Sequence, residues 1–318
     1  MTTKDEKVFV IINSYLVGDM LLVNSLAQNI KRLYANSKVV MLTNKTFYDL
    51  SKYQKDIDDV IIWDRHGIHK GFFGMLKFIK EFPYKKVFAS FPIYGTDRPI
   101  MLGYMLGSRY NLFVGKKNIF KFLQKTKYKL EKNSPKVQTQ HMDLLKGITK
   151  EELIDCPIKY FVDEKTISPI ENLNDYIVLC PISSKKTKDM PHETIIELIK
   201  NLNKKVVILG SGQASRELSK KLKEENLENL IDLTDKTTLQ QAAKVIKEAD
   251  GVISVDTGLM HMSCALDKPT VAVFYQGEQS GFAPDEKMYK TKSIFKNQSC
   301  DNIIKTLKEL INKGNSNG

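Results

Sequence analysis

The sequence has few of the features that mark secreted, membrane-spanning or zinc-binding proteins. Its four cysteines include no CxxC pair, which argues against a zinc knuckle and against a secreted disulfide framework. The first apolar run breaks at Asn13, too early for a secretory signal, and no run approaches the roughly 18 apolar residues of a transmembrane helix. We therefore expect a cytoplasmic protein whose thiols are reduced.

Common phosphate-binding and metal-binding motifs are also missing. The sequence contains no GxxxxGK loop, and no paired DxD carboxylates lie beside a plausible sugar site. A phosphate ligand would therefore need other contacts, and the sequence does not require a metal that bridges to it. We expect neither a metal nor a cofactor.

What is present is a regular alternation of short apolar runs and amphipathic stretches, the pattern of βαβ units around parallel sheets. At 318 residues the chain has the length of two domains of about 150 residues each. The predicted strands are 8–12, 38–42, 60–63 and 86–91 in the first half, and 176–180, 204–209, 230–233, 251–255 and 270–274 in the second. The predicted fold class is α/β, with two Rossmann-like doubly wound domains.

The domain boundary is expected where this alternation weakens, between about residues 115 and 174. We predict an N-terminal domain over residues 1–165 and a C-terminal domain over 166–300. A last helix over 301–313 follows a long loop that starts at Gln276, and it is a candidate for packing back on the N-terminal domain. The tail 314–318 contains only Gly, Asn and Ser and is expected to be disordered.

The net charge of +12 is unevenly distributed. Residues 1–165 contain 28 Lys plus Arg against 17 Asp plus Glu, whereas the rest contains 21 against 20. Such a field suits an anionic partner, either a phosphorylated substrate, an anionic membrane surface or nucleic acid. A Lys-rich composition with no partner is the alternative.

The segment 116–129 interleaves aromatic residues with Lys. This pattern favours contact with an anionic acceptor or membrane, and the alternative is a solvated helix face above a core stripe. The candidate contacts are Lys116, Lys117, Lys121 and Lys125.

The first candidate for chemistry is Gly18-Asp19, between the first predicted strand and the helix that follows. Glycine permits a tight turn, and an aspartate there is either an ordinary helix cap or a carboxylate at the mouth of a cleft. In the second role it could take a proton from an acceptor hydroxyl. Asp19 is therefore the candidate general base.

Three strand-to-helix turns of the second half form the other candidates. The loop after strand 176–180 carries Ser183, Ser184 and Lys188, whose hydroxyl and ammonium groups suit a diphosphate at a helix start. The turn after strand 251–255 reads Asp256-Thr257-Gly258-Leu259, with His261 one helical turn beyond Thr257. A short Gly loop ending in Gln213 completes the set, although a solvated Lys run and a core histidine are the plainer alternatives.

Together these residues resemble the heptosyltransferase family, glycosyltransferase family 9, whose members use ADP-heptose to build the inner core of lipopolysaccharide. The resemblance spans nearly the whole chain, from Gly18-Asp19 through Lys188-Asp-Met-Pro191, where the family has Lys-x-Trp-Pro, to Asp256-Thr-Gly-Leu-x-His261. It implies a GT-B fold, in which two Rossmann-like domains face each other across a cleft.

The resemblance also assigns roles to the residues. Asp19 would be the general base of an inverting transfer that needs no metal. The donor contacts would be Ser183, Ser184, Lys188, Gln213, Asp256, Thr257, Gly258, Leu259 and His261. The implied partners are a nucleotide sugar, most simply ADP-heptose, and an anionic glycolipid acceptor at the inner face of the cytoplasmic membrane, with no nucleic acid.

Departures from the family pattern keep alternatives open. Met190 stands where the family has Trp, Gln213 where an acidic residue would hold the ribose hydroxyls, and Tyr275-Gln276 where Tyr-Gly or Phe-Gly is usual. The donor could therefore be another ADP- or UDP-linked hexose or N-acetylhexosamine. A GT-B epimerase, an inactive GT-B subunit and a basic nucleic-acid-binding protein are the competing functions.

Overall fold

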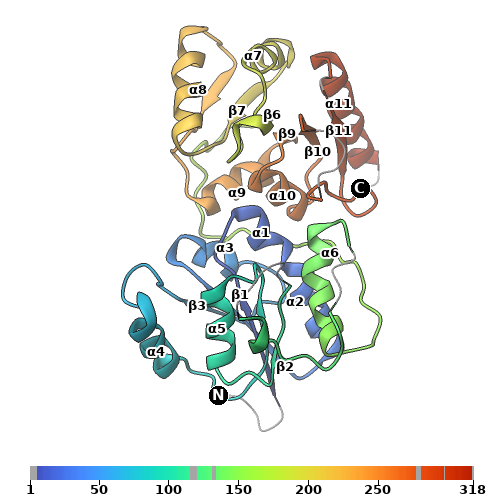
Figure 1. Cartoon of the computed structure of the whole chain (residues 1–318). Helices are drawn as coiled ribbons and strands as arrows, with labels where there is room; N and C mark the ends of the chain where they lie inside the picture. The colour runs from blue at the N-terminus through green and yellow to red at the C-terminus, as the bar shows by residue number, and fades with distance from the viewer. Residues whose placement is uncertain (1–5, 115–119, 131–133, 277–280, 297, 317–318) are drawn as a thin grey trace. The chain divides into compact units, whose positions relative to one another are not determined.

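A computed structural model describes residues 6–114, 120–130, 134–276, 281–296 and 298–316 of the chain (Figure 1). The chain divides into two compact units, Met1–Lys159 and Tyr160–Gly318. The division falls after Lys159 rather than after residue 165, because Tyr160 already hydrogen-bonds within the second unit, from its backbone N–H to the carbonyl oxygen of Ala265. Within the described residues, no helix is long and apolar enough to cross a membrane.

The first unit contains a five-stranded parallel sheet with the strand order β3-β2-β1-β4-β5. Its strands are β1 (Lys7–Ile12), β2 (Ser37–Thr43), β3 (Asp59–Ile62), β4 (Val87–Pro92) and β5 (Tyr110–Asn111). Both faces of the central strands are buried, as expected for a parallel sheet covered on both sides. The apolar runs therefore predicted the first four strands, whereas β5 has only two residues and gave no signal.

Helices cover the two faces of this sheet. They are α1 (Val17–Leu22), α2 (Asn24–Leu33), α3 (Tyr48–Lys52), α4 (Gly71–Glu81), α5 (Asp97–Met105) and α6 (Val137–Met142), with the short 3-10 helices η1 (Lys45–Phe47), η2 (Lys121–Leu123) and η3 (Asp143–Gly147). Helices α4 and α5 pack on one face, where Phe78 and Leu102 join Val8, Val10 and Ile12 of β1. On the other face, the Phe9 ring lies 4.9 Å from the ring of Tyr34, which follows α2.

The second unit contains a six-stranded parallel sheet with the order β11-β10-β9-β6-β7-β8. Its strands are β6 (Tyr176–Cys180), β7 (Lys205–Ile208), β8 (Leu230–Asp232), β9 (Gly251–Val255), β10 (Thr270–Phe274) and β11 (Thr291–Phe295). Strand β11 was expected to be part of a loop. Its polar and charged residues Thr291, Lys292 and Ser293 hide the strand from a pattern that depends on apolar runs.

Five α-helices flank the described part of this sheet, together with η4 (Lys186–Lys188). They are α7 (His192–Asn201), α8 (Gln213–Glu224), α9 (Leu239–Glu248), α10 (Gly258–Ala265) and α11 (Cys300–Ser316). Side chains of α7, α8 and α11 share one core with the sheet, whereas Met260 of α10 packs on Ala272 at the opposite face.

The last helix corrects two expectations. Instead of packing back on the first unit, α11 buries Ile303, Ile304 and Leu307 in the core of the second, beside α7 and strands β9 and β10. The backbone of Gly251 in β9 lies so close that an added Cβ would meet the Leu307 side chain at 2.8 Å. The helix also runs to Ser316, so the predicted tail does not begin at residue 314, and residues 317–318 lie outside the described residues.

Each sheet has a point at which the direction of strand progression reverses. In the first unit this switch lies between β1 and β4, and in the second between β6 and β9. The crevice beyond the carboxyl ends of such neighbouring strands is where doubly wound sheets bind ligands. The α/β fold class with two Rossmann-like units is confirmed. Its switch points identify the loops after β1, β4, β6 and β9 as the places to look for a ligand site.

Candidate functional site

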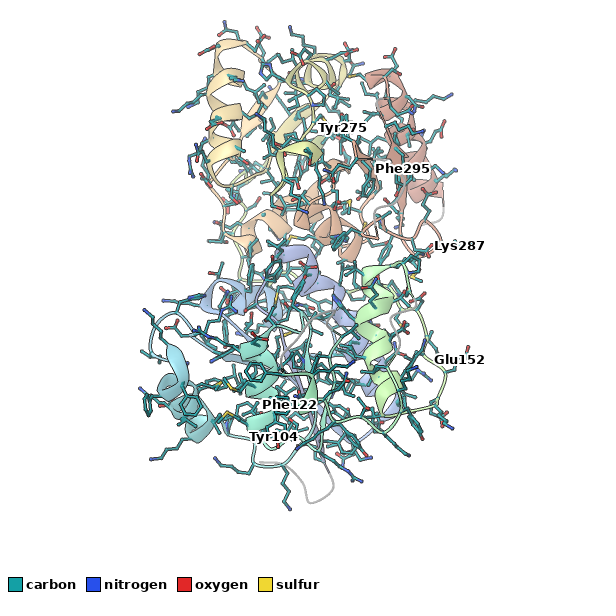
Figure 2. The ribbon with its side chains drawn as sticks, in the orientation of Figure 1. Tyr104, Phe122, Glu152, Tyr275, Lys287 and Phe295 are labelled. Carbon is teal, nitrogen blue, oxygen red and sulfur yellow. The ribbon has the colours of Figure 1, made fainter. Side chains whose placement is uncertain are left out.

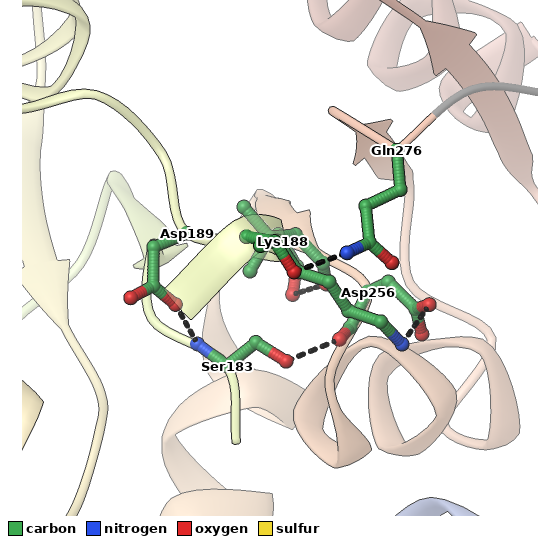
Figure 3. A network of polar contacts seen from close by, with 8 residues as sticks. Ser183, Lys188, Asp189, Asp256 and Gln276 are labelled. Atoms are coloured by element: carbon green, nitrogen blue, oxygen red, sulfur yellow. Dashed lines mark hydrogen bonds and ion pairs between the residues drawn. The ribbon is translucent and has the colours of Figure 1, made fainter. Parts of the chain in front are cut away.

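The loops after β6 and β9 meet at the switch point of the second sheet. The Ser183 hydroxyl donates a hydrogen bond to the carbonyl oxygen of Asp256 at 2.8 Å, which ties the two loops together. The Ser183 N–H in turn donates to Oδ1 of Asp189 at 2.7 Å, so the first loop also closes on itself (Figure 3). Burial raises the pKa of the Asp189 carboxyl, and the Ser183 hydrogen bond partly opposes this shift. The loop is therefore fixed from both ends.

An ion pair lies at the centre of this cluster. Lys188, at the end of η4, donates from Nζ to Oδ2 of Asp256 at 2.6 Å (Figure 3). The Lys188 side chain is 18% exposed and that of Asp256 is 9% exposed, so the pair is largely shielded from water. An ammonium group has three N–H donors that could bind an anion. The hydrogen bond to Oδ2 of Asp256 uses one of them.

An aromatic and a histidine complete the surroundings of the ion pair. The Lys188 ammonium lies 5.5 Å from the centre of the Phe282 ring, and His261 meets the same ring edge-on at 6.3 Å between centroids. Burial lowers the pKa of His261 to about 4, a shift that the carboxylate of Asp256 opposes and the ammonium of Lys188 reinforces. At neutral pH, His261 is therefore an uncharged group beneath the ion pair.

The turn after β9 presents a helix start to the same place. Thr257 is the N-cap of α10, and its side chain makes no capping hydrogen bond. Thr257, Gly258 and Leu259 are each partly exposed, in contrast to the buried residues 260–265 that follow. The first N–H groups of a helix favour negative charge, so the turn adds donors to those of Lys188.

Two predicted donor contacts are not joined to this cluster by any described interaction. Ser184 is exposed beside Ser183. Gln213 is exposed at the start of α8 and donates from Nε2 to Oε1 of Glu217 at 2.9 Å. Its loop is instead tied to the turn after β8, where Asp235 accepts from the Gly212 N–H at 3.0 Å and pairs with Arg216. Both residues lie at the carboxyl edge of the sheet, next to the cluster rather than in it.

The switch point of the first unit contains Asp19. It is buried in the first turn of α1, and its backbone carbonyl accepts a hydrogen bond from Nδ2 of Asn13 at 3.0 Å. Across the switch, Tyr94 follows β4 and hydrogen-bonds to the Asp19 carboxylate. Burial, then the charge of Asp19 and this hydrogen bond, raise the pKa of Tyr94 far above its usual value, so the phenol stays protonated and donates to the carboxylate.

The lysines of the predicted contact segment 116–129 do not share one environment. Lys116 and Lys117 lie outside the described residues. Lys121 opens η2 as an exposed residue, whereas Lys125 places its ammonium 4.2 Å from the centre of the Tyr104 ring. Of the aromatic residues there, only Phe122, labelled with Tyr104 in Figure 2, is strongly exposed, at 76%.

Several residues of the two switch points were not predicted from the sequence. Asn13, Tyr94 and Phe282 belong to none of the motifs, and each acts through contacts that only the folded chain creates. Asp189 is part of Lys188-Asp-Met-Pro191, but its contact with Ser183 was not predicted. A further contact, from the side-chain amide of Gln276 to the Thr187 hydroxyl, joins the loops after β10 and β6 (Figure 3). For Tyr94 alone a signal existed, because it lies shortly after the predicted strand 86–91, which neighbours β1 in the sheet.

Comparison with known proteins agrees with this geometry. The model of glycosyltransferase family 9 (heptosyltransferase) matches residues 95–310, which include the whole switch-point cluster of the second unit. The chain belongs to glycosyltransferase family 9. The resemblance based on the Asp256-Thr-Gly-Leu-x-His261 pattern is thereby confirmed.

Solved structures related to this family 9 chain show the same fold at low sequence identity. A family 9 glycosyl transferase from Veillonella parvula is 14% identical with a TM-score of 0.82, over 96% of this chain and 97% of that one. The E. coli heptosyltransferase WaaC, solved with ADP, is 17% identical with a TM-score of 0.77, over 95% and 99% of the two chains. These likenesses show that the chain shares the α/β fold of these proteins, with two Rossmann-like units.

Curated relatives match a shorter part of the family 9 chain. Lipopolysaccharide heptosyltransferase 2 of Salmonella typhimurium is 34% identical over 93 residues, 27% of this chain and 27% of that protein. The chain thus spans about a quarter of the length of the curated relative, and its donor and acceptor are matters for proposal.

The environment of His261 yields a testable pH dependence. Its pKa of about 4 in the folded protein lies below the ordinary value of 6.5, so the unfolded chain binds a proton there before the folded one does. The free energy of unfolding should therefore lose a contribution as pH falls from 6.5 to 4. Urea unfolding at pH 7 and pH 5 should show a smaller loss for His261→Gln than for the wild type.

The exposed residue His66 supplies the matched control. His66→Gln should retain the pH dependence of the wild type. Equal losses of stability in wild type and His261→Gln would show that this imidazole titrates normally and is not held neutral by burial.

Proposed function

We propose that this protein is an inverting, metal-independent glycosyltransferase that transfers heptose from ADP-heptose to a lipopolysaccharide or lipooligosaccharide core acceptor. The observation that carries the proposal is the Lys188–Asp256 ion pair, at 2.6 Å, between two strand-end loops of the second unit. Charged groups held at a sheet switch point suit the diphosphate of a nucleotide sugar. Family membership and the ADP bound in the E. coli heptosyltransferase WaaC support this assignment.

In the proposed donor site, Lys188 and the start of α10 bind the diphosphate. Asp256 holds the Lys188 side chain in place, so little side-chain entropy would be lost when the ligand binds. Two N–H donors of the ammonium group would then face the phosphate oxygens. Ser183, Ser184, Thr257, Gly258 and Leu259 would supply further hydroxyl and backbone donors, neutral His261 would line the pocket beneath, and Gln213 would reach the ribose.

In the proposed reaction, Asp19 is the general base. Its carboxylate would remove the proton from an acceptor hydroxyl while that oxygen forms a bond to the anomeric carbon. The bond from the anomeric carbon to the donor phosphate breaks on the opposite side, so ADP leaves and the configuration inverts. Tyr94, which donates to the Asp19 carboxylate, would orient it so that the other oxygen accepts the proton. The leaving charge would be stabilised by Lys188 and the α10 start.

The charge distribution supports an anionic acceptor. Residues 1–159 contain 27 Lys plus Arg against 15 Asp plus Glu, whereas residues 160–318 contain 22 of each. The first unit therefore carries the entire net charge. A phosphorylated glycolipid would be attracted to it, and we propose that the protein works in the cytoplasm at the inner face of the membrane, without binding nucleic acid.

A second candidate keeps the fold and changes the donor. Gln213, where an acidic residue would be expected to bind ribose, is exposed and bonded to Glu217. Another ADP- or UDP-linked hexose or N-acetylhexosamine could therefore be the donor, and transfer assays should include these sugars beside ADP-heptose.

The role of Asp19 can be tested by Asp19→Asn. Removal of a general base should lower kcat by about 10² to 10⁴, while the affinity for ADP, measured by calorimetry, should stay within about twofold because the donor site lies in the second unit. Asp97→Asn, which neutralises an exposed carboxylate after the neighbouring strand β4, should keep wild-type turnover. Full turnover in Asp19→Asn would exclude Asp19 as the general base, whereas absence of transfer by the wild type would favour a GT-B epimerase or another non-transferase.

Metal independence is a separate expectation. The described ranges contain no group of three or more His, Cys, Asp or Glu residues placed to hold a metal ion, and Lys188 already supplies positive charge for the leaving diphosphate. Transfer rates should therefore be unchanged in EDTA. Loss of transfer in EDTA that magnesium or manganese restores would contradict the proposed mechanism.

A further inference from the structure

The first unit exposes an unusual concentration of large apolar side chains around the start of α4. We call this surface the α4 patch and define it as Ile68, Phe72, Phe73 and Leu76, whose exposed fractions are 64%, 53%, 83% and 38%. Single exposed apolar residues are common, but four within nine residues are not. Helix α4 lies at the edge of the first unit, after the edge strand β3 (Figure 1), so the patch requires an explanation.

Packing on the opposite side of α4 prevents the patch from turning inward. Met75 and Phe78 are buried in the core of the first unit together with Trp63. The helix start is packed tightly on the preceding loop, because a Cβ at Gly74 would meet the backbone of His69 at 2.3 Å. His69 is itself fixed by the Phe78 ring, 5.0 Å away, and by Glu81, 3.2 Å from its Nε2 atom. The aromatic side chains of the patch are thus held toward solvent.

The charges around the patch are mostly positive. Exposed lysines flank it at positions 70, 77 and 80, and Arg65 precedes it. Two acidic residues also lie there. Asp64 accepts hydrogen bonds from the backbone N–H groups of Gly67 and Ile68, and Glu81 lies within 3.9 Å of Lys77 as well as near His69. The patch therefore combines apolar insertion groups with a basic rim. A helix with these two properties fits the boundary between anionic headgroups and acyl chains.

We propose that the α4 patch docks this protein on a bilayer that contains anionic phospholipids. We favour the bilayer over a protein partner because of the arrangement of the side chains. The apolar residues lie around the start of one helix and lysines flank them, so the apolar groups could enter the acyl region while the lysines contact anionic headgroups. The inference rests on the proposed function in that the acceptor would be a membrane glycolipid. It places the membrane contact on α4 rather than on segment 116–129, where Phe120 is partly buried and Leu123 is buried.

The test is sedimentation of the full-length protein with vesicles. Wild-type protein should bind vesicles that contain phosphatidylcholine and phosphatidylglycerol, because anionic lipids attract a basic surface. Binding should weaken with added salt. Phe72→Ser combined with Phe73→Ser should reduce the partition coefficient about tenfold or more. Replacing Lys70, Lys77 and Lys80 with Gln should reduce it similarly, and only for the anionic vesicles.

The matched control is Phe122→Ser, which removes an equally exposed phenylalanine from segment 116–129 and should leave binding unchanged. Unaltered binding of the double Phe variant, equal binding to pure phosphatidylcholine, or no binding by the wild type would each overturn the proposal. So would a dimer, seen by light scattering, that the double Phe variant dissociates, because the patch would then join two copies. ADP affinity should be measured on the same variants and should not change. Vesicle binding tests the α4 patch and ADP affinity tests the donor site, so the failure of one proposal can be distinguished from the failure of the other.

Discussion

The ion pair between Lys188 and Asp256 is the interaction on which the candidate donor site depends. Removing two charges from water is costly, and a shielded pair contributes little net stability compared with apolar residues of the same size. The fold nevertheless places both charges in the loops after β6 and β9, where the strand order reverses, beside the hydroxyl of Ser183 and the ring of Phe282. Such a pair is better explained by an anionic ligand that uses the remaining donors of Lys188 than by stability.

The first unit has the same sheet topology but different polar groups at its switch point. Its switch point contains a buried carboxylate, Asp19, with a phenol donor, Tyr94, from the next strand of the sheet. A carboxylate bound by a neutral donor keeps one oxygen oriented without losing its charge to an ion pair. The two units thus share one fold and differ in the charge at their switch points, with a cation–carboxylate pair in one and a carboxylate–phenol pair in the other.

The regular parts of the fold could be predicted from the sequence because buried parallel strands are continuous apolar runs. Both sheets were predicted in this way. Asp19, Ser183, Lys188 and Asp256 were predicted as site residues because they lie in loops or turns after predicted strands, and His261 because it lies one helical turn beyond Thr257. Strand β11 was missed because Thr291, Lys292 and Ser293 break its apolar run, and the packing of α11 on the second unit depends on a close approach at Gly251 that no pattern reveals. Asn13 and Phe282 gave no sequence signal, because their roles exist only through contacts of the folded chain.

The donor site is tested most directly by thermal unfolding of the protein with ADP, UDP, GDP and CDP. Each shift in melting temperature is measured relative to the same protein without ligand. A ligand that binds the folded state raises the melting temperature by mass action. The proposed donor site predicts a shift with ADP that disappears in Lys188→Ala. It should also disappear in Lys188→Met combined with Asp256→Asn, which leaves no unpaired charge, and persist in the exposed control Lys185→Ala. No shift with any nucleotide, or an undiminished ADP shift in both Lys188 variants, would contradict the proposed donor site.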